Sequence, residues 1–214
     1  MFARDRELLI LEPSLVRDVG WAGQRLVSGT GDVLGTTLTM SNQDVGFDLA
    51  GVDGGFVVVV GGVVYEVVAR LSNTQLTISR MRGNDSGAVL VPSPTTGASV
   101  EVLTYVPQIG VVHEQMLAMV GIDAQAQAGP GVVTEASITN ANELRVYEAL
   151  GALHLVYAAA SALVDENSAV GYKAKMYRER FAAQRGLVVV KIDSDGDGVA
   201  DVARRPSVVQ MVRV

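Results

Sequence analysis

The sequence predicts an α+β protein, with a small all-β barrel or sandwich inserted ahead of a helical bundle and a strand-like C-terminal arm. Between residues 36 and 106, β-branched and apolar residues alternate with polar ones, as they do in half-buried strands. From Pro107 onward the apolar residues recur every three or four positions, as on helices that bury one face. We therefore divide the chain into an N-terminal segment (1–35), a β-barrel or sandwich domain (36–106), a helical bundle (107–186) and a C-terminal arm (187–214).

The N-terminal segment favours no single structure. An apolar patch at residues 7–11 is stopped by Pro13, and residues 14–26 could form one or two amphipathic turns before the loop SGTGD. The segment lacks the long apolar core and the small-residue cleavage site of a signal peptide, so we expect none.

Five or six short strands are predicted in the β region. The runs 56–60 and 63–71 flank Gly61-Gly62, a two-residue connection that is typical of a β-hairpin. The run 56–60 is almost continuous valine, which indicates a strand covered on both sides, and packing between subunits could supply the second cover. Further strands are predicted at 36–40, 75–81, 88–91 and 99–106, and their Gly, Asn, Asp and Pro turns favour a small barrel or sandwich.

Three helices are predicted after Pro107. The first covers residues 111–120 and ends near Gly121. The second is long and begins at a cap formed by Thr139 or Asn140. The sequence DENS at 165–168 ends it and caps the third, which we expect to end at Gly186. The buried stripe of the third helix is predicted to comprise Val170, Ala174, Tyr177 and Phe181.

The tail is predicted to consist of two strands around a loop. Residues 187–192 and 207–214 are apolar, and DSDGDGVAD lies between them. A terminal strand as apolar as 207–214 must pair, because an unpaired apolar edge promotes aggregation. We expect either a hairpin partner or addition to another chain.

The Asp-rich loop is a candidate cation site. Asp193, Asp195, Asp197 and Asp201, with Gly198, match the first nine positions of a DxDxDG calcium loop, in which alternate carboxylates converge on a hard cation. Arg204 stands where a bidentate Glu is expected, and flanking helices are not predicted. A calcium site is therefore one interpretation of these four aspartates, and a plain Asp/Gly turn between two strands is the other.

The composition favours a protein that buries apolar surface against other subunits over one that carries out catalysis. Hydrophobic residues make up 49% of the 214 residues and the mean hydropathy is +0.29, yet no apolar run approaches the roughly 20 residues that cross a bilayer. Surplus apolar surface predicts burial between subunits, with a Val- and Ala-rich core as the alternative. The chain has no cysteine, which excludes disulfides and thiolate chemistry.

Charge is distributed unevenly along the chain. Residues 1–170 carry 8 basic and 18 acidic residues, whereas residues 171–214 carry 9 basic and 5 acidic ones. A basic segment on an acidic body is suited to an acidic partner surface, although a solvated helix face gives the same pattern. The overall acidity, with a pI of about 4.9, argues against sequence-specific nucleic-acid binding but permits loose contact with DNA.

No catalytic constellation stands out in the sequence. His113 and His154 fall on different predicted helices beside apolar faces, where core or interface roles are the commoner ones. HExxH, GxSxG and nucleotide-binding glycine motifs do not occur, and the glycine-rich runs at 23–35 and 51–56 are predicted to be turns. We therefore expect that the protein is not an enzyme and has no organic cofactor.

The C-terminal third resembles a known family. ELRVYEALGALHLVYAAASALV, YKAKMYRERFAAQRG, DSDGDGVAD, Arg204-Arg205 and SVVQMVRV together resemble the head–tail connector, or adaptor, proteins of tailed bacteriophages. The resemblance covers residues 139–214 well, and LEPSLVRDVGWAGQRL fits it less distinctly. It implies a helical bundle that forms a ring beneath the portal, usually twelvefold, with a C-terminal tail that docks onto portal subunits. The β region is not part of the minimal helical connector and would be an insertion.

We accordingly expect a structural virion protein of the neck, assembled in the host cytoplasm, that joins the portal to the tail and continues the DNA channel. The expected partners are further copies in a dodecameric ring, the portal protein, other neck or tail proteins and, non-specifically, packaged DNA, but no membrane. The residues predicted to bind partners are Lys173, Arg178, Arg180, Arg204, Arg205, Val208, Val209, Met211 and Val212.

Two alternatives remain open. The first is a calcium-dependent adhesion or carbohydrate-binding module, with the β region as its binding face and the Asp loop as its metal site. The second is a different phage neck or tail-completion protein, which sixfold rather than twelvefold symmetry would indicate.

Overall fold

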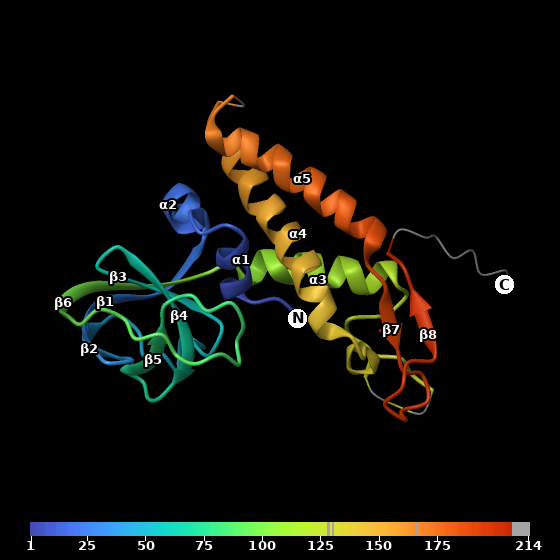
Figure 1. The fold of residues 1–214 in the computed structure, drawn as a ribbon, viewed down its shortest axis with the longest axis horizontal. Coiled ribbons are helices and arrows are strands. Elements are labelled where there is room, and N and C mark those ends of the chain that lie inside the picture. Colours follow the sequence, from blue (N-terminus) through green and yellow to red (C-terminus); the bar gives the residue numbers. More distant parts are fainter. Residues whose placement is uncertain (128, 130, 166, 207–214) are drawn as a thin grey trace. The chain divides into compact units, whose positions relative to one another are not determined.

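The computed structural model describes residues 1–127, 129, 131–165 and 167–206. The chain forms two compact units. The barrel unit is Arg4–Val106, and the helical unit comprises Pro107–Val214 together with Met1–Ala3. A closed six-stranded antiparallel barrel and a set of helices confirm the α+β class (Figure 1).

The β region is a barrel and not a sandwich. Its strands are β1 (Gln24–Leu34), β2 (Thr37–Gln43), β3 (Val57–Val60), β4 (Val63–Arg70), β5 (Gln75–Ser79) and β6 (Thr95–Thr104). They close in the order β1-β2-β5-β4-β3-β6, so that each strand has a hydrogen-bonded neighbour on both sides. The β3–β4 hairpin turns at Gly61 and Gly62, whose φ angles of 56° and 81° are left-handed, as the predicted two-residue turn requires.

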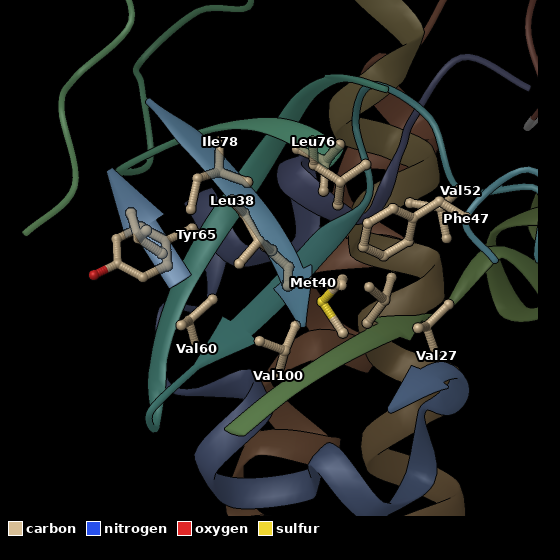
Figure 2. Packing of buried hydrophobic residues seen from close by; sticks show 14 residues of the cluster. Val27, Leu38, Met40, Phe47, Val52, Val60, Tyr65, Leu76, Ile78 and Val100 are labelled. Atoms are coloured by element: carbon tan, nitrogen blue, oxygen red, sulfur yellow. The ribbon is translucent and has the colours of Figure 1, made fainter. Parts of the chain in front are cut away.

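Alternating side chains fill the barrel. Figure 2 shows Leu38 and Met40 of β2 pointing toward Leu76 of β5 and Val100 of β6, and all four are buried. The valine run of β3 is covered on its barrel face and only partly on the other, where Val59 is half-buried. Val58 and Val60 belong to this core, and Val57 is buried without belonging to it.

Strand β1 corrects the prediction for residues 24–34. The run SGTGD was predicted to be a loop, but it lies within β1 and bends where the pairing with β2 shifts between Thr30 and Gly31. A Cβ at Gly29 would lie 2.0 Å from the backbone oxygen of Asn42, and one at Gly31 would lie 2.7 Å from that of Thr39. The glycines therefore allow close backbone approach at a β-bulge, and do not mark a turn.

One further expectation for the barrel unit was wrong, and the structure of the segment left open is now defined. Residues 88–91 form no strand, although the Leu90 N–H donates to Ser79 Oγ (2.9 Å) and its carbonyl accepts from the Arg80 N–H (3.0 Å). The ambiguous segment 1–35 is helical before β1, with α1 (Asp5–Leu11), α2 (Leu15–Val19) and the 3₁₀ turn η1 (Gly20–Ala22). Pro13 separates α1 from α2, as a residue that cannot continue a helix should.

The helices of the second unit follow the predicted order. They are α3 (Val106–Met119), the 3₁₀ turn η2 (Glu135–Ser137), α4 (Ala141–Ser161) and α5 (Ala169–Leu187). α3 begins before residue 111 because Pro107 is tolerated in a first helical turn, and the chain turns at Gly121, where φ is +71°. Asn140 is the N-cap of α4, as predicted, and Ser168 caps α5 by accepting from the Gly171 N–H.

The end of the described chain differs from the prediction. α5 continues through Gly186 to Leu187, because Gly186 keeps a helical backbone rather than the left-handed one that ends helices. The predicted strand 187–192 is reduced to β7 (Val190–Ile192). Its hairpin partner is β8 (Val202–Arg204), a strand that was not predicted, whereas residues 207–214 lie outside the described residues.

Tyrosine and aliphatic side chains form the core of the helical unit. Met116 and Leu117 of α3 pack with Leu144 and Tyr147 of α4 and with Val190 of β7, and all five are buried. Among the described residues, no helix combines the length and the mean hydropathy that crossing a membrane requires.

Candidate functional site

Helix α5 is the most exposed long element of the helical unit. Of its 19 residues only Tyr177 is buried, whereas α4 buries 11 of its 21. Its charged residues are five basic ones and Glu179. The basic residues are Lys173, Lys175, Arg178, Arg180 and Arg185. A helix with so little buried surface in one chain has most of its area free for a partner.

The predicted partner-binding residues of α5 lie on this exposed helix. Lys173 Nζ stands 5.6 Å from the centroid of the Tyr157 ring, and the Arg180 guanidinium carbon stands 5.8 Å from that of Tyr177. These distances are in the range of cation–π contacts, so aromatic rings orient two of the cations. Arg178 is exposed.

Two arginines attach the end of the described chain to the helices. Arg204 Nη1 donates to the backbone oxygen of Val120 (2.5 Å), just beyond α3, where a cation interacts favourably with the helix C-terminus. Arg185 Nε and Nη2 both donate to the Pro206 carbonyl, at 3.3 and 3.1 Å. Arg204 therefore makes an internal contact, while Arg205 is exposed. The predicted contacts Val208, Val209, Met211 and Val212 lie outside the described residues.

The Asp loop joins β7 to β8. Ligand oxygens of Asp193, Asp195 and Asp197 lie within 4.8 Å of one another, close enough to hold one metal ion. Asp201 does not belong to this group, and its Oδ2 accepts from the N–H and the Oγ of Ser194 at 2.9 and 2.8 Å. The structure thus brings three of the four predicted carboxylates together.

Backbone hydrogen bonds hold this loop in shape. Asp193 accepts from the N–H groups of Gly198 (2.8 Å) and Gly196 (2.7 Å), and these two bonds lower the pKa of its carboxyl. Both glycines have left-handed φ angles, 84° and 86°, which other residues adopt only with strain. The carboxylate set suits a hard cation such as Ca²⁺, whose ligands are oxygens.

A groove runs between α4 and α5. Its first part has a volume of about 430 Å³, is mostly apolar and includes Val112 of α3. A second hollow of about 340 Å³ adjoins it, because His154 and Arg178 line both. We call the two together the α4–α5 groove. It is lined by Val112, Gln115, Gly151, His154, Leu155, Ala158, Ser161, Gly171, Ala174, Lys175, Arg178, Phe181, Ala182 and Arg185.

His154 lines both hollows of this groove. Its Nδ1 is buried and has no hydrogen-bond partner among the described residues. Burial lowers the pKa of its ring, while a hydrogen bond to the backbone of Ala174 opposes that effect.

The second histidine, His113, belongs to a partly buried ion-pair network that sequence reasoning missed. His113 Nδ1 lies 2.6 Å from Oε1 of Glu148, and its Nε2 lies 3.1 Å from Oε2 of Glu135. The Glu148 Oε2 accepts the N–H groups of Phe2 and Ala3, both at 2.8 Å. Desolvation opposes a charge on His113, but the hydrogen bond and the charge of Glu148 outweigh it and raise the pKa of the ring. This network holds the first residues of the chain on α4.

The barrel unit contains a second buried charge cluster. Glu66 of β4 is completely buried and pairs with Arg6 Nε (2.7 Å) and with Arg82 Nε. Arg6 Nη2 also donates to the backbone oxygen of Arg82 (2.9 Å). All three side chains are at most 8% exposed, so this cluster joins α1 to the barrel and offers little surface to a partner.

Asp5 is the most perturbed carboxyl of the described chain. It is 1% exposed, its Oδ1 accepts from the Tyr105 N–H (2.7 Å), and burial raises its pKa to about 7. No pattern in the sequence indicates this residue, because the contact that buries it joins residues 100 positions apart.

No family model, no curated protein and no solved structure matches the chain.

Proposed function

We propose that the protein is a non-enzymatic subunit of a tailed-phage neck, which forms a ring between portal and tail and continues the DNA channel. The observation that carries the proposal is α5, a 19-residue helix that buries one residue and carries five cations, of which Lys175, Arg178, Arg180 and Arg185 are exposed. Such a helix needs a second surface to be well packed, and stable interfaces bury roughly 800 Å² on each partner. The resemblance of residues 139–214 to head–tail connectors is the reason for proposing that this assembly is a phage neck.

In this proposal α3, α4 and α5 form the ring-building bundle, and the residues from β7 onward form the docking arm. Arg185 of α5 donates two hydrogen bonds to the Pro206 carbonyl, so the described part of this arm ends at a point fixed on α5. The closed barrel unit is an addition to this bundle. Because every strand of the barrel is paired on both sides, we assign chain-to-chain strand pairing to the arm and not to the barrel.

The primary test is assembly. Mass photometry and negative-stain imaging of the purified chain should show a ring of many copies, and twelvefold symmetry is expected. The variant Arg178→Glu should weaken assembly or portal attachment, whereas Arg70→Glu, an exposed arginine of the barrel unit, should not. A monomer at every concentration, or equal effects of the two variants, would contradict the proposal.

The arm has its own test. Deleting residues 207–214 should abolish attachment to portal particles while leaving the far-UV circular dichroism spectrum and the barrel intact. Retained attachment would count against the docking role.

A calcium-dependent binding module is the second candidate, because the structure gathers three aspartates of the loop. Ca²⁺ bound there would stiffen the β7–β8 turn in either function. The two candidates differ in assembly: a ring that forms equally with calcium or with a chelator favours the neck subunit, and a calcium-dependent monomer that binds a carbohydrate favours the module.

A further inference from the structure

The α4–α5 groove combines apolar walls with charged residues that are all basic. The apolar walls of its first hollow are formed by Val112, Leu155 and Phe181. The charged lining residues are Lys175, Arg178 and Arg185, and all three are exposed. Glu179, the acidic residue of α5, lines neither hollow. The groove therefore favours an occupant that carries both negative charge and an apolar side chain.

The Asp loop has this combination. Its nine residues, 193–201, include four carboxylates and no basic residue. Asp195 and Asp197 are exposed, and Val199 is 65% exposed. The Val199 N–H donates to Asp197 Oδ1 (2.7 Å), so the apolar side chain is held next to the carboxylates. Charge and hydrophobicity of the loop are thus complementary to those of the groove.

The loop of one chain is held away from the groove of the same chain. Asn140, the N-cap of α4, fixes β7, because its Nδ2 donates to the Val189 carbonyl and its Oδ1 accepts from the Lys191 N–H, both at 2.9 Å. The groove begins on α4 at Gly151, about 16 Å further along the helix. The loop lies at the end of the β7–β8 hairpin that is remote from α5 (Figure 1). It therefore reaches a groove only on another copy of the chain.

We propose that the Asp loop of one copy binds in the α4–α5 groove of a neighbouring copy. The occupant is a second copy, because the loop supplies both kinds of contact that the groove offers. The contact is heterologous, since it joins two different surfaces, and repeated contacts of this kind close into a ring when the rotation between copies allows it. The inference rests on the proposed function in taking that ring as the assembly, and it names the two surfaces that join neighbours.

Disulfide formation between two copies tests this contact, since the natural sequence has no cysteine. Two single variants are mixed: Val199→Cys places a thiol in the loop, and Ala182→Cys places one in the groove. The control mixture replaces Ala182→Cys by Ala183→Cys, at the next residue of α5, which is also exposed but lines neither hollow. A chelator in both mixtures keeps cations from neutralising the loop.

The groove mixture should form the disulfide between the two variants at least about tenfold faster than the control mixture, because binding holds only the groove thiol next to the loop thiol. Different affinity tags on the two variants distinguish this disulfide from those between identical copies. Equal rates in the two mixtures would assign the groove to another partner and overturn the proposal.

Charge reversal tests the ionic part of the contact. Asp195→Lys with Asp197→Lys, added to the loop variant, should slow the disulfide at least about tenfold. Lys175→Glu with Arg178→Glu, added to the groove variant, should then restore the rate. All four positions are exposed, so these changes leave the core intact. A rate that the second reversal does not restore would overturn the pairing of loop and groove.

Mass photometry of the natural chain reports ring formation separately. A fast disulfide in the groove mixture, together with dimers or open chains of copies, would retain this inference and reject the twelvefold ring. A ring together with equal rates in the two mixtures would retain the proposed function and reject this inference.

Discussion

Replacing Asp5 by Asn should make the stability of the barrel unit almost independent of pH between 5 and 8. The Asp5 carboxyl is buried in α1, accepts from the Tyr105 N–H, and has a second oxygen, Oδ2, with no partner among the described residues. Burial raises its pKa from 3.8 to about 7. An Asn side chain keeps the acceptor for Tyr105 and carries no charge at any pH.

The sign of the effect follows from proton binding. Between the two pKa values the folded chain keeps the proton on Asp5 while the unfolded chain has lost it. The stabilisation is complete below the unfolded pKa and is lost as pH rises through the folded pKa. A difference of about three pKa units corresponds to about 4 kcal/mol in total, of which about 2.5 kcal/mol falls between pH 5 and pH 8.

Urea denaturation at several pH values measures this pH-dependent contribution to the free energy of unfolding. Trp21 is the only tryptophan and lies in the barrel unit, so its fluorescence reports that unit. The free energy of unfolding of Asp5→Asn minus that of the natural chain should rise by about 2.5 kcal/mol from pH 5 to pH 8. The control Asp48→Asn removes an exposed carboxylate of the same unit and should leave the slope unchanged. A constant difference between Asp5→Asn and the natural chain would refute the assignment.

Three further predictions concern the helical unit. Gly151→Ala should destabilise it by about 1–3 kcal/mol in thermal melts, because the new Cβ would lie 2.6 Å from Cγ1 of Val112, whereas Gly186→Ala, which meets nothing within 4 Å, should be neutral or slightly stabilising. His113→Ala removes the ionic partner of the buried Glu148 carboxylate, which keeps only its hydrogen bonds from the Phe2 and Ala3 N–H groups, and should cost about 3 kcal/mol near pH 6. Since the pKa of this ring is raised, that cost should shrink as pH rises through the folded pKa, and a cost that is constant from pH 6 to pH 9 would contradict the ion pair. Calorimetric titration with Ca²⁺ should give heat of binding, and Asp193→Asn should weaken the calcium affinity by more than about tenfold. The absence of heat at millimolar calcium would reject the metal interpretation.

Local patterns predicted much of the fold. The two-residue turn at Gly61-Gly62, the caps at Asn140 and Ser168 and the change of period near Pro107 are properties of a few adjacent residues, so the sequence was sufficient for them. The same local reasoning misread residues 24–34. Glycines there allow two backbones to approach, and only the partner strand distinguishes that use from a turn.

The candidate site was predicted in its residue types but not in its contacts. The three converging aspartates are close in sequence, so their spacing was informative. By contrast, Glu148 meets His113 across 35 residues and Arg204 meets Val120 across 84. Such pairs leave no periodic trace in a single sequence, because their spacing is set by how helices and hairpins pack.

The two arginine contacts at the end of the described chain also determine how that chain bears mechanical load. A pull on residues beyond Pro206 reaches Arg185, in the last turn of α5, before it reaches the β7–β8 hairpin. The hairpin is fastened in turn to the end of α3 through Arg204. Tension applied beyond Pro206 is thus shared by the C-terminal ends of α3 and α5. The Asp loop lies at the opposite end of the β7–β8 hairpin and is shielded from this tension.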